Sequence, residues 1–146
     1  MGFWIRILLL LALFTPVVPL TASAEDGFVI IAHPDTPATE VTLPDLGRIF
    51  RKKITHWENG TPILPVEQGG LGARKISFHK AVLNMGEAAV NAYWINQAMT
   101  SGRVPPKRYD SPRLVIEYVS RHPGAIGFVA ADTPIPARVR VVPIRK

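Results

Sequence analysis

The apolar run near residue 30 restricts the fold more than any other feature of the sequence. Residues 28–32 read Phe-Val-Ile-Ile-Ala, with no polar residue between them. A strand with one face in water alternates apolar and polar residues, whereas a short uninterrupted apolar run is typical of a strand covered on both faces. A strand of this kind needs further layers on either side, so the run indicates a layered domain.

The order of the remaining elements predicts an α/β fold. Thr42 has the features of a helix N-cap, with Pro44 and Asp45 in the first turn, and Ser111-Pro112 begins another helix in the same way. Pro65 cannot donate to a strand ladder, so its position is predicted to lie at an edge or bulge. In order, the predicted elements are a strand at 27–33, a helix after residue 42, a strand at 63–67, helices beginning near residues 74, 86 and 112, and strands at 125–130 and 139–144. This order predicts a mixed sheet of about four strands covered by helices, with a long polar connection at 100–110.

The first 24 residues have the pattern of a cleavable signal peptide. Arg6 precedes an apolar run at 7–14, and Ala22-Ser23-Ala24 places small residues where a signal peptidase reads them. The alternative is a transmembrane helix, which needs about 20 apolar residues, whereas this run soon meets Pro16. We therefore expect a signal peptide at 1–24, one domain at 25–146 and a periplasmic location.

Composition narrows the chemistry of the exported domain. The chain has no cysteine, which excludes disulfides, thiolate metal sites, cysteine catalysis and a lipid-modified N-terminal cysteine, so the product is not expected to be a lipoprotein. The formal net charge is +6. A solvated basic surface and an anionic partner explain this charge equally well. Nucleic acid is not expected, because the basic residues are dispersed and lack interleaved aromatic residues.

Motifs of catalysis and metal binding are missing from the sequence. The four histidines (His33, His56, His79 and His122) are far apart and are predicted to be surface or cap residues rather than metal ligands. Five carboxylates near loops and helix starts are expected to serve as caps: Asp45, Glu58, Glu67, Asp110 and Asp132. No nucleophile elbow, Walker loop or dinucleotide fingerprint occurs. We expect no enzymatic activity, no metal and no cofactor.

One loop has a physical reason to bind an anion. It follows the strand at 63–67 and consists of Gly69, Gly70, Leu71, Gly72, Ala73 and Arg74, hereafter the glycine loop. Free backbone N–H groups at a helix start attract anions, glycines allow close approach, and a guanidinium can add a bidentate contact. The alternative is an ordinary flexible connection between a strand and a helix.

Several blocks of the sequence resemble one protein family. The first runs from Thr42 to Val66 and includes Ile49-Phe50, Trp57 and Gly60-Thr61-Pro62-Ile63. Further blocks follow in the same order: Tyr93-Trp94, then Ser101-Gly102-Arg103-Val104-Pro105-Pro106, then His122-Pro123-Gly124-Ala125-Ile126-Gly127-Phe128-Val129. Together they resemble the phosphate-type periplasmic substrate-binding proteins, and in particular short members of that superfamily with a single lobe.

The resemblance implies a single type 2 binding-protein lobe and phosphate or a related oxyanion as ligand. In full-length members the corresponding loop reads Ser-Gly-Thr-Arg, whereas this chain keeps the glycines and the arginine without the hydroxyls. The implied function is an accessory substrate-binding component of a phosphate-type ABC uptake system. The alternative is an interaction or sensory module without a ligand. A transporter or sensor partner, or a second copy in a homodimer, are ways in which a single lobe would complete its site.

Overall fold

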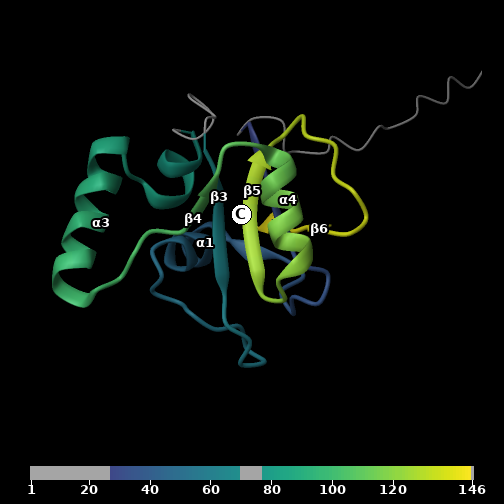
Figure 1. The fold of residues 1–146 in the computed structure, drawn as a ribbon, viewed down its shortest axis with the longest axis horizontal. Coiled ribbons are helices and arrows are strands. Elements are labelled where there is room, and N and C mark those ends of the chain that lie inside the picture. Colours follow the sequence, from purple (N-terminus) through teal and green to yellow (C-terminus); the bar gives the residue numbers. More distant parts are fainter. Residues whose placement is uncertain (1–26, 70–76, 146) are drawn as a thin grey trace, which may run out of the picture.

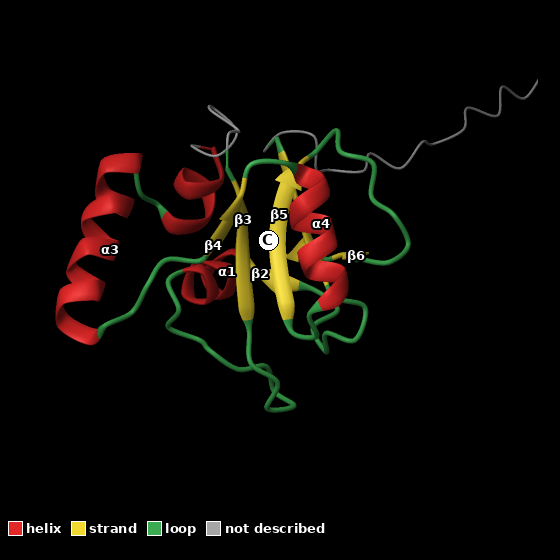
Figure 2. Cartoon of the chain, viewed as in Figure 1, coloured by secondary structure: helices red, strands yellow, loops and turns green. Residues whose placement is uncertain are grey.

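The computed structural model describes residues 27–69 and 77–145, which form a mixed sheet with helices on both sides (Figures 1 and 2). The strands are β1 (Phe28–Ala32), β2 (Val41–Thr42), β3 (Leu64–Gln68), β4 (Lys107–Tyr109), β5 (Ala125–Ala130), β6 (Arg140–Val141) and β7 (Ile144–Arg145). The helices are α1 (Leu43–Phe50), the π-helix η1 (His79–Leu83), α3 (Glu87–Ser101) and α4 (Pro112–Arg121). The main sheet has five strands in the order β4-β3-β5-β1-β6, and β2 pairs with β7 in a second sheet.

Apolar side chains from β1 and β5 fill the core on both faces of the sheet. On one face Phe128 of β5 stacks on Phe78, with ring centroids 3.7 Å apart, and Phe28 meets Phe78 edge-on. On the other face α4 covers the sheet (Figure 2), and its buried Val115 and Val119 belong to the core on that side. The layered domain indicated by the apolar run and the α/β class predicted from the order of the elements are therefore confirmed.

Strand direction brings three carboxyl ends to one edge of the sheet. β3 runs parallel to both β4 and β5, whereas β1 runs antiparallel to β5. Backbone groups of β3 alternate between its two neighbours: the Leu64 amide donates to Gly124, and the Gly69 amide donates to Tyr109. Pro65 therefore faces the β4 side, where β4 begins only opposite Val66. The missing N–H of Pro65 falls where no strand needs it, as the sequence predicts.

Local side chains set the predicted helix starts. The Thr42 hydroxyl accepts a hydrogen bond from the Asp45 amide at 3.2 Å, and the Ser111 hydroxyl accepts one from the Leu114 amide at 3.3 Å. The hydrogen bond from Thr42 and the contact with Arg48 hold the pKa of the Asp45 carboxyl below its usual value. Both predicted caps are confirmed, and Asp45 serves its cap as expected.

Several predicted details are wrong. The connection at 100–110 contains β4, and the predicted strand at 139–144 is split at Pro143 into β6 and β7, which belong to different sheets. The main sheet therefore has five strands instead of about four. Among the residues that the structure describes, no helix is long and apolar enough to span a membrane.

Gly124 fixes the turn into β5, and its replacement should be costly. It has a φ of +87°, and a Cβ atom there would lie 2.2 Å from the Pro62 carbonyl oxygen. We expect Gly124→Ala to lower the free energy of unfolding by about 2–4 kcal/mol, since strain and overpacking add. Gly102 has a φ of +65° with no atom within 4 Å, so Gly102→Ala should cost only about 1 kcal/mol. Urea denaturation measures the free energy of unfolding of both variants. If the two variants lose the same amount of stability, the packing argument is wrong.

Candidate functional site

The predicted glycine loop begins at the carboxyl end of β3. Gly69, its first residue, directly follows Gln68, the last residue of β3. Gly70, Leu71, Gly72, Ala73 and Arg74 lie outside the described residues. In sheets with parallel strands, ligands bind beyond the carboxyl ends of the strands, and β3, β4 and β5 all end at this edge. The position of Gly69 therefore puts the start of the loop at an edge suited to a binding site.

Gly69 is in close contact with β4 and with Asp110, the residue that follows β4. Its amide donates a hydrogen bond to the Tyr109 carbonyl oxygen at 2.8 Å, so this N–H is already used. A Cβ atom at Gly69 would lie 2.8 Å from the Asp110 carboxylate and 2.9 Å from Cδ of Arg108. A larger residue at position 69 would therefore force the side chains of Arg108 and Asp110 to shift.

A buried carboxylate lies two residues before Gly69. Glu67 is 3% exposed, and its two oxygens have different partners. Oε1 lies 3.3 Å from Nε2 of the buried His79, and Oε2 accepts a hydrogen bond from the Arg108 guanidinium at 3.2 Å. Arg108 itself is half-exposed on β4. Glu67, His79 and Arg108 form what we call the Glu67 cluster.

The Glu67 carboxyl is ionised at neutral pH. Burial alone would raise its pKa, but the hydrogen bond and charge of His79, together with Arg108, outweigh burial and hold the pKa below the ordinary value. A buried carboxylate is stable only when paired and hydrogen-bonded, and this one has both of its oxygens engaged. The Glu67 cluster therefore places the Arg108 guanidinium near the start of the loop and already contains the counter-anion of that charge.

Gln68 ties the same end of β3 to β5. Its side chain is buried, and Oε1 accepts a hydrogen bond from the Ala130 amide at 3.3 Å. Ala130 is the last residue of β5, so two parallel strands are joined where they end. This bond and the Glu67 cluster hold the start of the glycine loop in a fixed position, which suits a pre-formed binding edge.

Sequence reasoning missed the Glu67 cluster. His79 was expected at the surface or at a cap, yet it is 2% exposed, because η1 packs it beneath the sheet beside Glu67. Glu67 was expected to act as a cap, yet it lies inside a strand. A signal existed in the sequence: a carboxylate that continues an apolar strand needs a polar partner in the core, and His79 follows the core residue Phe78. For His33 and His122, ring hydrogen bonds to backbone groups two and four residues away agree with cap-like roles.

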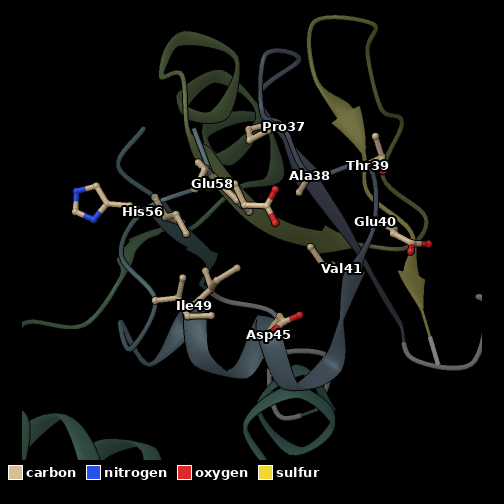
Figure 3. A pocket seen from close by; sticks show the side chains of 12 residues that line it. Pro37, Ala38, Thr39, Glu40, Val41, Asp45, Ile49, His56 and Glu58 are labelled. Carbon is tan, nitrogen blue, oxygen red and sulfur yellow. The ribbon is translucent and has the colours of Figure 1, made fainter. Parts of the chain in front are cut away.

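A cavity lies at the other end of the sheet, next to the residues that precede β3. It has a volume of about 400 Å³ and is lined by Pro37, Ala38, Thr39, Glu40, Val41, Asp45, Ile49, Ile54, His56, Trp57, Glu58 and Ile63. Figure 3 shows the carboxylates of Glu58 and Asp45 at the hollow, with the His56 ring at its outer margin. The lining includes three carboxylates and neither lysine nor arginine, so the cavity disfavours an oxyanion. Within residues 27–69 and 77–145, no group of three or more histidine and carboxylate side chains could hold a metal ion.

Fold and comparisons agree on the class of protein. The mixed sheet, in which the parallel strands β3, β4 and β5 end at one edge, has the architecture of a domain of the PBP superfamily. Residues 22–142 match the family model described as the PBP superfamily domain, and the chain belongs to this family. The predicted resemblance to phosphate-type binding proteins is thereby confirmed at the level of the fold. No match is found among curated proteins.

Solved structures with the same fold are about twice as long as this chain. A putative phosphate ABC transporter substrate-binding protein with bound phosphate from Clostridium perfringens aligns with a TM-score of 0.62 and 21% identity, over 81% of this chain and 44% of that one. An ABC-type phosphate transport receptor from Vibrio cholerae aligns with a TM-score of 0.59 and 17% identity, over 81% of this chain and 46% of that one. PstS from Borrelia burgdorferi aligns with a TM-score of 0.58 and 19% identity, over 81% of this chain and 47% of that one. The chain thus spans less than half the length of these proteins.

Removing the charge of Glu67 tests the Glu67 cluster. We expect Glu67→Gln to lower the free energy of unfolding at pH 7 by about 1–3 kcal/mol, because Arg108 loses its counter-anion and His79 loses its carboxylate partner. The lowered pKa means that the ionised carboxylate stabilises the fold above pH 4.5, the ordinary value for glutamate, and that this stabilisation is lost as the pH falls further. The difference in free energy of unfolding between wild type and Glu67→Gln should therefore become smaller below pH 4.5.

Glu117→Gln is the matched control. Glu117 pairs with Arg121 at 2.8 Å on α4, but both side chains are more exposed than Glu67. Glu117→Gln should lower the free energy of unfolding by less than about 1 kcal/mol, as is usual for surface ion pairs. Urea denaturation between pH 3 and pH 8 measures both variants. An equal loss in the two, or a Glu67→Gln effect independent of pH, would contradict the description of the cluster.

Proposed function

We propose that this protein is an exported oxyanion-binding protein, with phosphate as the preferred ligand, which acts as an accessory substrate-binding component of a phosphate-type ABC uptake system. The observation that carries the proposal is the start of the glycine loop at the carboxyl edge of β3 in a member of the PBP superfamily. Two relatives in fold are named as phosphate transport proteins, and one of them holds phosphate.

The proposed site consists of Gly69, Gly70, Leu71, Gly72, Ala73 and Arg74. The Gly69 amide already donates a hydrogen bond to the Tyr109 carbonyl oxygen, so it would not donate one to the anion. Because Gly69 has no side chain, the anion could still approach its backbone closely, and the hydrogen-bond donors would be the later amides of the loop and Arg74. Arg108 adds positive charge beside the loop, and Glu67 partly cancels it. An anion on one lobe also remains exposed to water, where each charged contact is weak. The proposed affinity is therefore low, in the millimolar range.

Calorimetric titration with phosphate tests the proposal. Wild type should bind phosphate, and Arg74→Ala should abolish the heat, because it removes the guanidinium of the site. Arg113→Ala removes the same charge from the exposed surface of α4 and should leave the binding unchanged. Sulfate titrated in parallel reports selectivity among oxyanions. If neither anion releases heat with wild type and neither raises its melting temperature, the chain is not an oxyanion binder.

Glu67→Gln sharpens the same experiment. If the Glu67 carboxylate competes with a bound anion for Arg108 and His79, then the variant should bind phosphate more tightly than wild type, by about 5-fold to 30-fold for 1–2 kcal/mol. The binding is measured in the folded variant at pH 7. Unchanged affinity would mean that the anion lies beyond the influence of the cluster.

The second candidate function is an interaction or sensory module without a ligand. The observation that favours it is the ion-paired state of Arg108, whose nearest counter-charge is provided by the chain itself. In this case phosphate has no effect, and a transporter or sensor protein binds the lobe directly. Recovery of a stoichiometric partner from periplasmic extract at low salt, together with a negative phosphate titration, would favour this function.

Export and the absence of enzymatic activity belong to the same proposal. The signal-like segment at 1–24 supports a periplasmic location, and relatives in fold that are described as binding proteins support a non-enzymatic role. Expression in a bacterium with a periplasm should release a product that begins at Glu25. The intact mass of the protein in the periplasmic fraction checks this, and a product that retains residues 1–24 would contradict the signal peptide.

A further inference from the structure

The outer face of helix α3 is apolar, and no other part of residues 27–69 and 77–145 covers it. Figure 1 places α3 at one margin of the molecule, away from the strands. Its buried residues are Val90 and Trp94, and the Tyr93 hydroxyl anchors it by donating to the Arg51 carbonyl oxygen at 3.0 Å. Ile95 is 63% exposed and Met99 is 83% exposed, the highest value among the large apolar side chains that the structure describes.

These exposed residues form one continuous stripe. Ala88, Ala92, Ile95 and Met99 follow one another at spacings of four, three and four residues, and all four are exposed. With 3.6 residues per turn they line one side of α3, opposite Val90 and Trp94. We call them the α3 stripe. A surface helix normally presents charged or polar residues on this side, so α3 is apolar on two opposite faces.

We propose that the α3 stripe is the contact surface of a homodimer, in which two copies of α3 pack antiparallel about a twofold axis. The stripe is complementary to itself. An axis that passes midway between residues 92 and 95 places Ala92 opposite Ile95 of the second copy, and Ala88 opposite its Met99. Each large side chain meets a small one, so the two helices approach closely without a gap.

Charge at the ends of the helix favours the same arrangement. No charged residue occurs between Glu87 and Arg103 in the sequence. Antiparallel packing brings Glu87 of one copy within about one helical turn of Arg103 of the other, and the symmetry repeats this contact at the opposite end. A parallel pair would instead place like charges together at both ends. The long uncharged stretch between Glu87 and Arg103 imposes no repulsion along the interface.

The size of the stripe predicts a weak dimer. From residue 88 to residue 99 it extends about 16 Å, which buries on the order of a few hundred Å² per copy, below the roughly 800 Å² per partner of a standard interface. The dissociation constant is therefore expected to be in the range of about 0.1–1 mM. The proposal does not depend on oxyanion binding, because the α3 stripe contains no residue of the glycine loop.

Sedimentation velocity over a concentration series tests the dimer. From about 0.02 to 2 mM, the weight-average mass of wild type should rise from that of one chain towards that of two. Met99→Glu introduces one negative charge at each end of the stripe, close to Glu87 of the second copy. It should keep the protein monomeric without loss of fold, since Met99 is largely in water. Ala89→Glu places the same charge a quarter turn away from the stripe and should dimerise as wild type does. Monomeric wild type at 2 mM, or dimerisation of Met99→Glu, would overturn the proposal.

Cysteine variants test the register, since the chain has no cysteine of its own. Ala88→Cys and Met99→Cys are purified separately, mixed and oxidised. In the proposed register residue 88 faces residue 99 of the second copy, so the mixed disulfide should predominate. The 88–88 and 99–99 pairs lie about 16 Å apart, beyond the 7 Å limit for Cα atoms in a disulfide. If pure Ala88→Cys or pure Met99→Cys cross-links as efficiently as the mixture, the antiparallel register is wrong.

Discussion

The burial of β5 on both faces is the constraint on which the rest of the structure depends. All six of its residues are buried, so the sheet needs a helical layer on each side, which α4 provides on one face and α1 with η1 on the other. β5 also determines how closely β3 can approach. Gly127 leaves room for Val66, because a Cβ atom there would lie 2.9 Å from the Val66 carbonyl oxygen. The position of β3, and with it the candidate site, follows from packing around β5.

The last two residues of β3 and the glycine that follows them have three different roles. Glu67 points into the core and meets His79 and Arg108, Gln68 bonds to the end of β5, and Gly69 passes beneath the side chains of residues 108 and 110. The edge of the sheet is therefore held by side-chain contacts as well as by the ladder. Both sets of contacts lie within the described residues, so the position of this edge is set by the chain itself.

Features determined by neighbouring residues could be predicted from the sequence, and those determined by distant contacts could not. The caps at Thr42 and Ser111 depend on residues three positions away, so their pattern is readable. β4 has the polar sequence Lys107-Arg108-Tyr109 and becomes a strand only because β3 lies beside it. Glu67 and His79 have an ordinary polar appearance in the sequence, and their burial arises only when η1 packs beneath the sheet. The position of Gly69 was consistent with the predicted loop, while the bond that occupies its amide depends on Tyr109, forty residues further on.

The pairing of Glu67 with Arg108 and His79 has a consequence for how the protein folds. A lobe whose cationic groups awaited an external anion would be destabilised whenever that anion was scarce. Here the chain supplies its own counter-ion, so the charges are balanced as soon as β3, β4 and η1 come together. Folding of this edge of the sheet therefore needs no external anion, because Glu67 neutralises the charge of Arg108 from within the chain.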